Sequence, residues 1–276
     1  MSSDPRTLAV RGDLADRRLE GLVVADRFVD ARPMQVIVPA AGVRVSPDPS
    51  AEQVDQVLAG ERFYVFDIAD GLAFGQVRRD GYVGYVAADA LAPAGSSPTH
   101  RIAARLAYAF AEPHFKAPAA GPFSMNALVT VSGSEAGFDR TEHGWIRQVH
   151  LSPIGVVETD AAAVAERFVG AAYRWGGREG AGLDCSGLVQ QALFACGRAC
   201  PRDSDQQEHL GASVDPADLR RGDLVFWTGH VAMMLDEMRI VHANGFHMAV
   251  AVEPLAGAIA RIEASGGGPP IAWRRP

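Results

Sequence analysis

The last third of the chain holds one cysteine and two histidines whose types and order could support nucleophilic chemistry. Cys185 stands at the first turn of a predicted helix, directly after Asp184. Unpaired backbone N–H groups and the helix dipole at such a place favour a thiolate, so we expect a lowered thiol pKa. A cysteine nucleophile also needs a general base within hydrogen-bond reach and a polar group that orients the base. His230 and His242, on the predicted strands that follow, could supply both.

We expect a different role for each of these residues. Cys185 would attack, His230 would take the thiol proton and return it to the leaving amine, and His242 would hold the ring of His230 in one tautomer. Each has a structural alternative, because a lone cysteine on an apolar helix can be a small core residue and a histidine can be buried or exposed. His247 is an alternative orienting group, although it lies beyond Asn244–Gly245.

Residues that flank the cysteine could assist the reaction or shape its loop. The Tyr173 phenol could donate to the developing oxyanion beside the backbone N–H of Cys185, or it could pack the loop together with Trp175. Asp184 is a candidate substrate-binding residue that hydrogen-bonds the loop, and its structural alternative is the N-cap of the helix. Ser186 could donate to a substrate carboxylate or be a solvated first-turn serine.

An α+β domain over residues 158–276 must position these side chains. An amphipathic helix is predicted from Asp160 to Val169, because Thr159 or Asp160 can cap its start and Gly170 stands near its end. A glycine-rich turn and an apolar helix over 188–195 carry the cysteine. The histidines belong to predicted antiparallel strands: Asp223–Trp227, His230–Leu235 and Arg239–Ala243.

The preceding part of the chain indicates two small β-modules. Residues 34–95 contain short alternating apolar segments separated by turns such as Ala69-Asp70-Gly71, a pattern typical of a small β-barrel. Residues 99–154 end in a similar way, because Gly144-Trp145-Ile146 comes sixty residues after Gly84-Tyr85-Val86. We interpret this as a diverged duplication. Residues 1–33 form an N-terminal extension, and a Pro/Gly/Ser-rich linker joins the modules.

Composition excludes several classes of protein. With 276 residues and 48% hydrophobic content, the chain is long enough for more than one packed core. A net charge of −7 and a pI near 5.6 argue against nucleic acid as a partner. The charged segment 1–19 holds no apolar core of a signal peptide, and no later run is long enough for a membrane helix. We therefore expect a cytoplasmic protein without a membrane partner, unless the native start lies upstream.

The other two cysteines carry no chemistry in this interpretation. Three cysteines are too few for a secreted disulfide framework and fit a reducing compartment. Cys196 and Cys200 have no neighbouring ligands at the spacing of a zinc site, so we expect structural thiols, no metal and no cofactor. The oligomeric state is left open.

Motifs in the last domain follow one another in the order found in the NlpC-type cysteine peptidases, which this region resembles. They are Tyr173-x-Trp175-Gly176-Gly177, Asp184-Cys185-Ser186-Gly187, Pro201-Arg202-Asp203-Ser204-x-x-Gln207, Gly222-Asp223-Leu224, Gly229-His230-Val231 and Val241-His242-Ala243. The resemblance implies a papain-like fold that cleaves bacterial cell-wall peptides, commonly between γ-D-glutamate and a diamino acid. By position it makes Cys185 the nucleophile, His230 the base and His242 its orienting partner.

The first β-module is similar to bacterial SH3-like domains, through V-R-V-S-P, L-A-G-E-R and G-Y-V-G-Y-V. The second matches more weakly, and spacer modules are the alternative to ligand binding. The implied fold is multidomain: two small SH3-like β-barrels followed by an α+β papain-like (NlpC-type) catalytic domain. Within this family, some members combine SH3-like domains with the peptidase and recycle free murein peptides.

That subset implies further substrate-binding residues. Asp203 and Ser204 would bind the free α-amine of the substrate, and the alternative is a turn in which Asp203 caps a helix. Tyr85 and Tyr82, with Tyr64 as a weaker candidate, could close the amino end, while their acidic partner is not placed. The expected substrates are murein tripeptides or tetrapeptides with a free N-terminal L-Ala and either lysine or diaminopimelate third. The alternatives are an amidase or acyltransferase on the same scaffold, or a non-catalytic wall-peptide binding protein.

Overall fold

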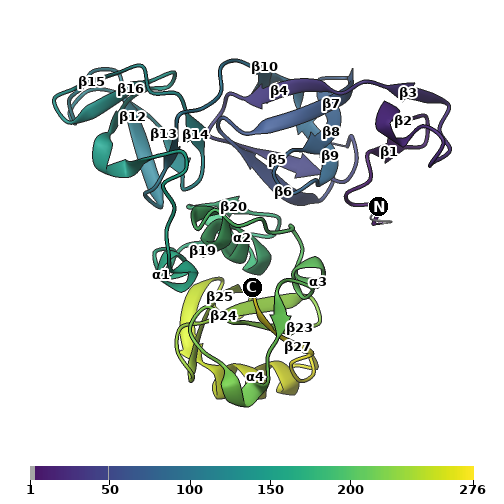
Figure 1. Ribbon diagram of the computed structural model, residues 1–276, viewed down its shortest axis with the longest axis vertical. Coiled ribbons are helices and arrows are strands. Elements are labelled where there is room, and N and C mark those ends of the chain that lie inside the picture. The colour runs from purple at the N-terminus through teal and green to yellow at the C-terminus, as the bar shows by residue number, and fades with distance from the viewer. Residues whose placement is uncertain (1–3, 49) are drawn as a thin grey trace. The chain divides into compact units, whose positions relative to one another are not determined.

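The computed structural model describes residues 4–48 and 50–276, which form two compact units (Figure 1). The N-terminal unit ends at Ile154 and the C-terminal unit begins at Gly155. Residues 1–3, the start of the predicted N-terminal extension, and residue 49 lie outside the described residues.

The first β-module is a seven-stranded antiparallel sheet in the order β10-β4-β7-β8-β9-β5-β6. Alternate residues of its strands are buried, as in β7, where Phe63 and Val65 point into the core and Tyr64 is only half-buried. A side chain at Gly75 would collide with the Tyr64 carbonyl, so glycine permits the close β7–β8 approach. The strands are β4 (Arg32–Val36), β5 (Ala40–Arg44), β6 (Gln53–Leu58), β7 (Arg62–Ala69), β8 (Leu72–Val77), β9 (Val83–Ala87) and β10 (Leu91–Pro93).

The N-terminal segment packs on this module. Its strands β1 (Val10–Arg11), β2 (Leu14–Asp16) and β3 (Arg27–Val29) form a small sheet of their own. Leu14 joins a hydrophobic cluster with Phe66 and Phe74 of the module, and Arg11 binds Asp67 at 2.7 Å. The segment expected as an extension is therefore an integral layer of the N-terminal unit.

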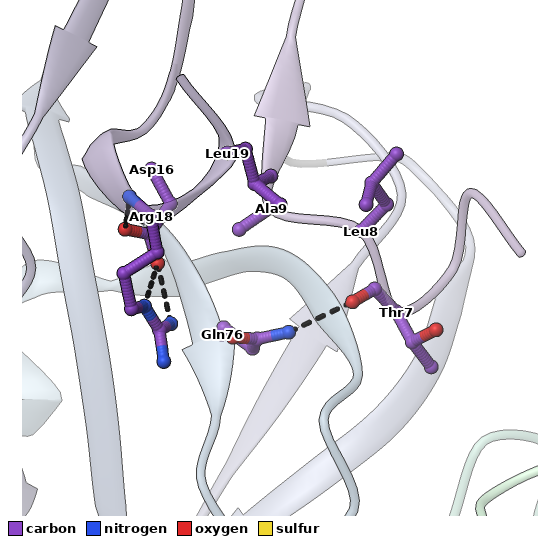
Figure 2. Close-up of a pocket in the computed structure, with 7 residues that line it drawn as sticks. All are labelled: Thr7, Leu8, Ala9, Asp16, Arg18, Leu19 and Gln76. Atoms are coloured by element: carbon purple, nitrogen blue, oxygen red, sulfur yellow. Dashed lines mark hydrogen bonds and ion pairs between the residues drawn. The ribbon is translucent and has the colours of Figure 1, made fainter. Parts of the chain in front are cut away.

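A pocket of about 380 Å³ lies between this segment and β8 (Figure 2). Its polar groups already have partners: Gln76 Nε2 donates to the Thr7 carbonyl at 2.9 Å, and buried Asp16 accepts three bonds from Arg18, at 2.9 Å from the backbone N–H, at 2.7 Å from Nε, and also from Nη2 (Figure 2). The Gln76–Thr7 bond ties the N-terminal segment to the sheet, and we assign the pocket no chemistry.

The second β-module consists of a three-stranded sheet, β14-β11-β18, and a five-stranded sheet, β13-β12-β17-β16-β15. Leu58 and Ala59 of the first module pack into its core beside Phe123 and Ile146, so the two modules share one hydrophobic cluster. Each module closes with a strand, a 3-10 turn and a short strand, as a diverged duplication would. The strands are β11 (His100–Ile102), β12 (Leu106–Phe110), β13 (Ala119–Ser124), β14 (Leu128–Val129), β15 (Gly133–Glu135), β16 (Phe138–Thr141), β17 (Gly144–Arg147) and β18 (Leu151–Pro153).

The C-terminal unit has a nine-stranded sheet in the order β20-β21-β19-β26-β25-β24-β23-β27-β22. Helix α2 packs on β24 and β25, while α4 covers the face formed by Ala232, Met234 and Ile240. The helices are α1 (Ala161–Glu166), α2 (Cys185–Ala195), α3 (Ser204–Gln207) and α4 (Leu255–Ala264). The strands are β19 (Ala172–Tyr173), β20 (Arg178–Glu179), β21 (Gly182–Leu183), β22 (Ala212–Ser213), β23 (Leu224–Trp227), β24 (His230–Met234), β25 (Arg239–Asn244), β26 (Ala249–Pro254) and β27 (Ala272–Arg275).

The predicted α+β layout of this unit is confirmed. The three histidine-region strands are antiparallel neighbours within one or two residues of their expected bounds. Asp160 caps α1 by accepting from the Ala163 N–H, and the helix ends at Glu166, three residues before the expected Val169. Within residues 4–48 and 50–276, no helix combines the length and apolarity that a membrane crossing requires.

Candidate active site

Cys185 is the first residue of α2, and a bonded loop fixes its position. Asp184 caps the helix, with Oδ1 accepting from the Gly187 N–H at 2.8 Å and Oδ2 accepting from the Gly176 N–H at 2.9 Å. A Cβ at Gly187 would meet the Gly177 carbonyl, so glycine allows the loop to pack against the helix. Asp184 is therefore a structural cap in the arrangement that presents the cysteine.

Arg202 completes this loop from outside the helix, and our sequence interpretation assigned it no role. Its guanidinium donates to Asp184 at 2.6 and 2.9 Å and to the Ser186 hydroxyl at 2.8 Å. Ser186 also donates to Asp184 at 3.2 Å, so the structure directs this candidate substrate ligand inward. The available signal was the arginine of the Pro201-Arg202-Asp203 motif, because an arginine that becomes buried requires a carboxylate partner.

The two histidines lie within direct hydrogen-bond distance of each other. His230 begins β24 and His242 lies on the neighbouring strand β25. His230 Nε2 is 2.8 Å from His242 Nδ1, and His242 Nε2 is 2.7 Å from Glu253 Oε1 on β26. Because His242 pairs with Ala251, Glu253 occupies the diagonal position on the same face of the sheet. Arg261 on α4 in turn donates to Glu253.

The nucleophile candidate lies beside the start of β24. Helix α2 packs against that strand, and the backbone N–H of Val231, the residue after His230, donates to the Cys185 sulfur. His230 Nε2 is already bonded to His242, which leaves Nδ1 as the ring nitrogen that can take the thiol proton. Cys185 thus lies beside the backbone next to His230, and the two histidines are joined directly.

The expectation of a lowered thiol pKa is wrong. Burial raises the pKa of the Cys185 thiol to about 12, with a further increase from the Asp184 charge, and the Val231 N–H and Arg202 offset this only in part. Burial likewise lowers the pKa of His230 to about 3, reinforced by His242 and Arg261 and opposed by Glu253. Both shifts favour the uncharged form of each group, a thiol and an imidazole.

Comparison with known families gives this arrangement a context. Residues 170–263 match the model of the NlpC/P60 family.

The C-terminal unit carries an NlpC/P60 domain.

Residues 43–91 match a model described as the SH3 domain of bacterial dipeptidyl-peptidases. Both matches confirm the predicted resemblance and fold class, because each falls within the region that the motifs indicated.

Curated relatives match part of the chain. A γ-D-glutamyl-L-lysine dipeptidyl-peptidase from Bacillus cereus is 33% identical over 132 residues, which is 45% of this chain and 39% of that protein. Dipeptidyl-peptidase 6 from Lysinibacillus sphaericus is 31% identical over 125 residues, 42% of this chain and 44% of that protein. The chain thus spans less than half the length of these relatives.

A solved structure of an NlpC/P60 family protein from Bacillus cereus has a similar fold. It superposes with a TM-score of 0.75 at 22% identity, covering 88% of this chain and 99% of that chain. At this level of identity the similarity concerns the fold alone.

The other predicted residues of the NlpC/P60 domain differ in burial and in their contacts. Burial raises the pKa of half-buried Tyr173 to about 12, so its hydroxyl stays a donor at neutral pH, and the charges of Cys185 and Asp184 act on it. Trp175 is 58% exposed. Asp203 forms a capping box with Gln206 at the start of α3, which is its structural alternative.

The candidate tyrosines of the N-terminal unit differ in burial. Tyr82 is a core residue, 5% exposed, in the hydrophobic cluster of the first module. Tyr85 is half-buried, with its ring 5.2 Å from that of Phe74. Tyr64 is also half-buried. Of the two main candidates, Tyr85 is the one with accessible surface.

A pocket of about 300 Å³ borders the histidine side of the site. Residues of three different segments line it, including both histidines: Trp227, Thr228, His230, His242, Asn244, Gly245, Phe246, Arg261, Ile262 and Ser265. It offers space next to the base, where a leaving group could be protonated.

Potential metal-ligand atoms of His242, His247 and Glu253 lie within 4.8 Å of one another. Two of these groups already bond each other, and the Arg261 cation sits on the same carboxylate. His247 is held by Asn244 at 3.0 Å, so it is not the partner of His230. The cluster is explained by the hydrogen-bond chain, and we assign it no metal.

Proposed function

We propose that this protein is a cysteine peptidase that hydrolyses the bond between γ-D-glutamate and the diamino acid of free murein peptides. The supporting observation is the ordered set of Cys185, His230 and His242, with its 2.8 Å histidine contact, inside an NlpC/P60 domain. The names of two relatives, a γ-D-glutamyl-L-lysine dipeptidyl-peptidase and dipeptidyl-peptidase 6, favour this substrate class. The product would be the dipeptide L-Ala-γ-D-Glu.

In the proposed reaction, the Cys185 sulfur attacks the γ-carbonyl carbon of D-glutamate while its proton passes to His230. The C–S bond forms, the C–N bond breaks, and His230 returns the proton to the leaving amine. Water then attacks the thioester with His230 again accepting a proton, which regenerates the thiol and releases the dipeptide carboxylate. The Cys185 N–H and the Tyr173 hydroxyl would donate to the oxyanion.

We propose that the enzyme recognises a free amino terminus. Asp203 and Ser204, both partly exposed, would bind the α-amine, with Trp175 as a further contact. A blocked amine could not form an ion pair with the Asp203 carboxylate, so the N-acetylated peptide should bind more weakly. The match to a dipeptidyl-peptidase SH3 domain supports this part, because a dipeptidyl-peptidase acts at a free terminus.

The decisive experiment compares L-Ala-γ-D-Glu-diaminopimelate, its lysine analogue and their N-acetylated forms. Mass spectrometry should find L-Ala-γ-D-Glu from the free peptides with wild type, none with Cys185→Ala, and unchanged release with the control Cys196→Ala. Cleavage by Cys185→Ala would overturn the nucleophile, and equal cleavage of the acetylated forms would overturn amine recognition. A product joined to an added small amine would instead indicate acyl transfer.

We also propose that the enzyme acts in the recycling of free murein peptides. We expect free peptides to be cleaved much faster than cross-linked peptides in intact sacculi, and the protein to fractionate with the cytoplasm. Faster release from sacculi would instead indicate remodelling of the wall.

A further inference from the structure

Glu253 ends a hydrogen-bond chain that begins at the base. His230 Nε2 lies 2.8 Å from His242 Nδ1, and His242 Nε2 lies 2.7 Å from Glu253 Oε1. The Arg261 guanidinium donates to that same carboxylate oxygen. His242 is 1% exposed and Glu253 is partly buried, so water does not compete freely for these bonds. The residues come from β24, β25, β26 and α4, and no sequence motif joins them.

The Glu253 carboxylate determines which ring nitrogens of His242 and His230 carry a proton. A carboxylate can only accept, so His242 Nε2 must carry a hydrogen and donate it. His242 is neutral, because burial lowers its pKa to about 3, and its Nδ1 therefore has a free lone pair. That lone pair accepts from His230 Nε2–H, which leaves Nδ1 of His230 unprotonated.

We propose that Glu253 is a positioning residue that holds His230 in the Nε2–H tautomer, with Nδ1 free to accept the thiol proton. The proposal rests on the proposed function of His230 as the base. Arg261 holds the carboxylate in place, and the negative charge of Glu253 favours the imidazolium that forms during attack. Glu253 touches neither the sulfur nor the substrate and acts only through His242.

The charges around the His230–His242–Glu253 hydrogen-bond chain agree with a positioning role for Glu253. His242 and Arg261 disfavour a positive charge on His230, and Glu253 is the group that favours it. His242 faces Arg261 and His247 as well. Removing the Glu253 carboxylate would leave only positive or neutral groups next to the histidine pair, which makes proton transfer from Cys185 harder.

The first test observes the tautomer directly in the full-length protein. Ring-nitrogen NMR of ¹⁵N-histidine-labelled wild type at neutral pH should show His230 and His242 protonated at Nε2 and bare at Nδ1. A wild-type His230 that carries its hydrogen on Nδ1 overturns the proposal. The NMR measurement needs no substrate. It therefore tests the role of Glu253 even if murein peptides are not cleaved and the proposed function fails.

The second test uses variants and the alkylation of Cys185 by iodoacetamide, located by mass spectrometry. Glu253→Ala should lower the alkylation rate near neutral pH by about 10- to 100-fold, the range found when the partner that orients a metal-bound histidine is removed. Glu253→Gln keeps an acceptor oxygen but no charge, so it should retain the tautomer and lose less. On any peptide that is cleaved, kcat should fall and KM should stay.

Glu166→Ala is the matched control, because Glu166 is also bound to an arginine, Arg221 at 2.7 Å, on the surface of the same unit. It should leave the alkylation rate and the tautomers unchanged. The proposal is overturned if Glu253→Ala equals this control in both readouts. If Glu253→Ala does not fold, the tautomer of wild-type His230 and the Cys185 alkylation rate of Glu253→Gln still test the proposal.

Discussion

Two arginine–carboxylate pairs serve the two halves of the candidate site, and they differ in how far they are buried. On the thiol side, the side chains of Arg202 and Asp184 are 1% and 6% exposed. On the histidine side, those of Arg261 and Glu253 are 24% and 15% exposed. The first pair is closed inside a loop, whereas the second borders a pocket.

The two pairs therefore support different properties of the site. The first holds the loop that carries Cys185 in shape, and the second sets the proton positions of the histidines. Asp184 ties two backbone N–H groups, a serine and Arg202 into one unit, so its loss would change the shape of the loop. Glu253 contacts one ring and one guanidinium, so its loss would change proton positions with less effect on the backbone. We therefore expect stability to depend on the first pair and reactivity on the second.

The largest expected effect comes from breaking the buried pair. Arg202→Met leaves Asp184 buried without its cation and should lower the free energy of unfolding by about 3–5 kcal/mol. Urea denaturation followed by circular dichroism measures this loss. The double variant Arg202→Met/Asp184→Asn should recover part of it, because no isolated charge remains. A loss below about 1 kcal/mol for Arg202→Met would remove the distinction between the pairs, because it is the size seen for exposed ion pairs.

A second effect concerns pH and belongs to the histidine side. The pKa values of His230 and His242 are lowered to about 3 from 6.5, so the unfolded chain binds more protons between these pH values. The free energy of unfolding should therefore fall as the pH drops from about 6.5 toward 3. Urea midpoints at pH 7, 6 and 5 measure this.

The control for the pH effect is His230→Gln, which removes one titrating ring. Carboxylates also titrate in acid, so the informative quantity is the difference between wild type and this variant. Wild type should lose more stability than the variant between pH 7 and pH 5. Parallel curves would mean that His230 is not a buried neutral imidazole.

The parts of the site carried by short motifs were predictable. Cys185 follows a capping aspartate at a helix start, and the strands of His230 and His242 are delimited by turns, so local patterns placed all three. Most strands of the first module were likewise visible through their turns and alternation, whereas β6 and β10 were not expected. The thiol pKa was not predictable in this way, because the helix terminus is visible in sequence whereas the burial that outweighs it is a property of the packed fold.

The supporting residues depended on contacts between distant segments. Glu253 faces His242 only because β25 and β26 pair in a particular register, and Arg261 reaches it from α4. Arg202 stood inside a recognised motif, but its partner Asp184 lies 18 residues earlier. Sequence patterns thus indicated the reacting groups, while the groups that hold them followed from the tertiary structure.

The smallest expected effect is at an exposed ion pair, which tests whether burial or charge pairing decides the comparison. Arg221 binds Asp160 and Glu166, both at 2.7 Å, nearly as short as the 2.6 Å of the buried pair, but the three side chains are 38–43% exposed. Water screens such pairs, so Arg221→Met should cost less than about 1 kcal/mol in urea denaturation and leave Cys185 alkylation unchanged. A loss as large as that of Arg202→Met would show that pairing geometry outweighs burial, and the distinction between the two pairs of the site would then need another cause.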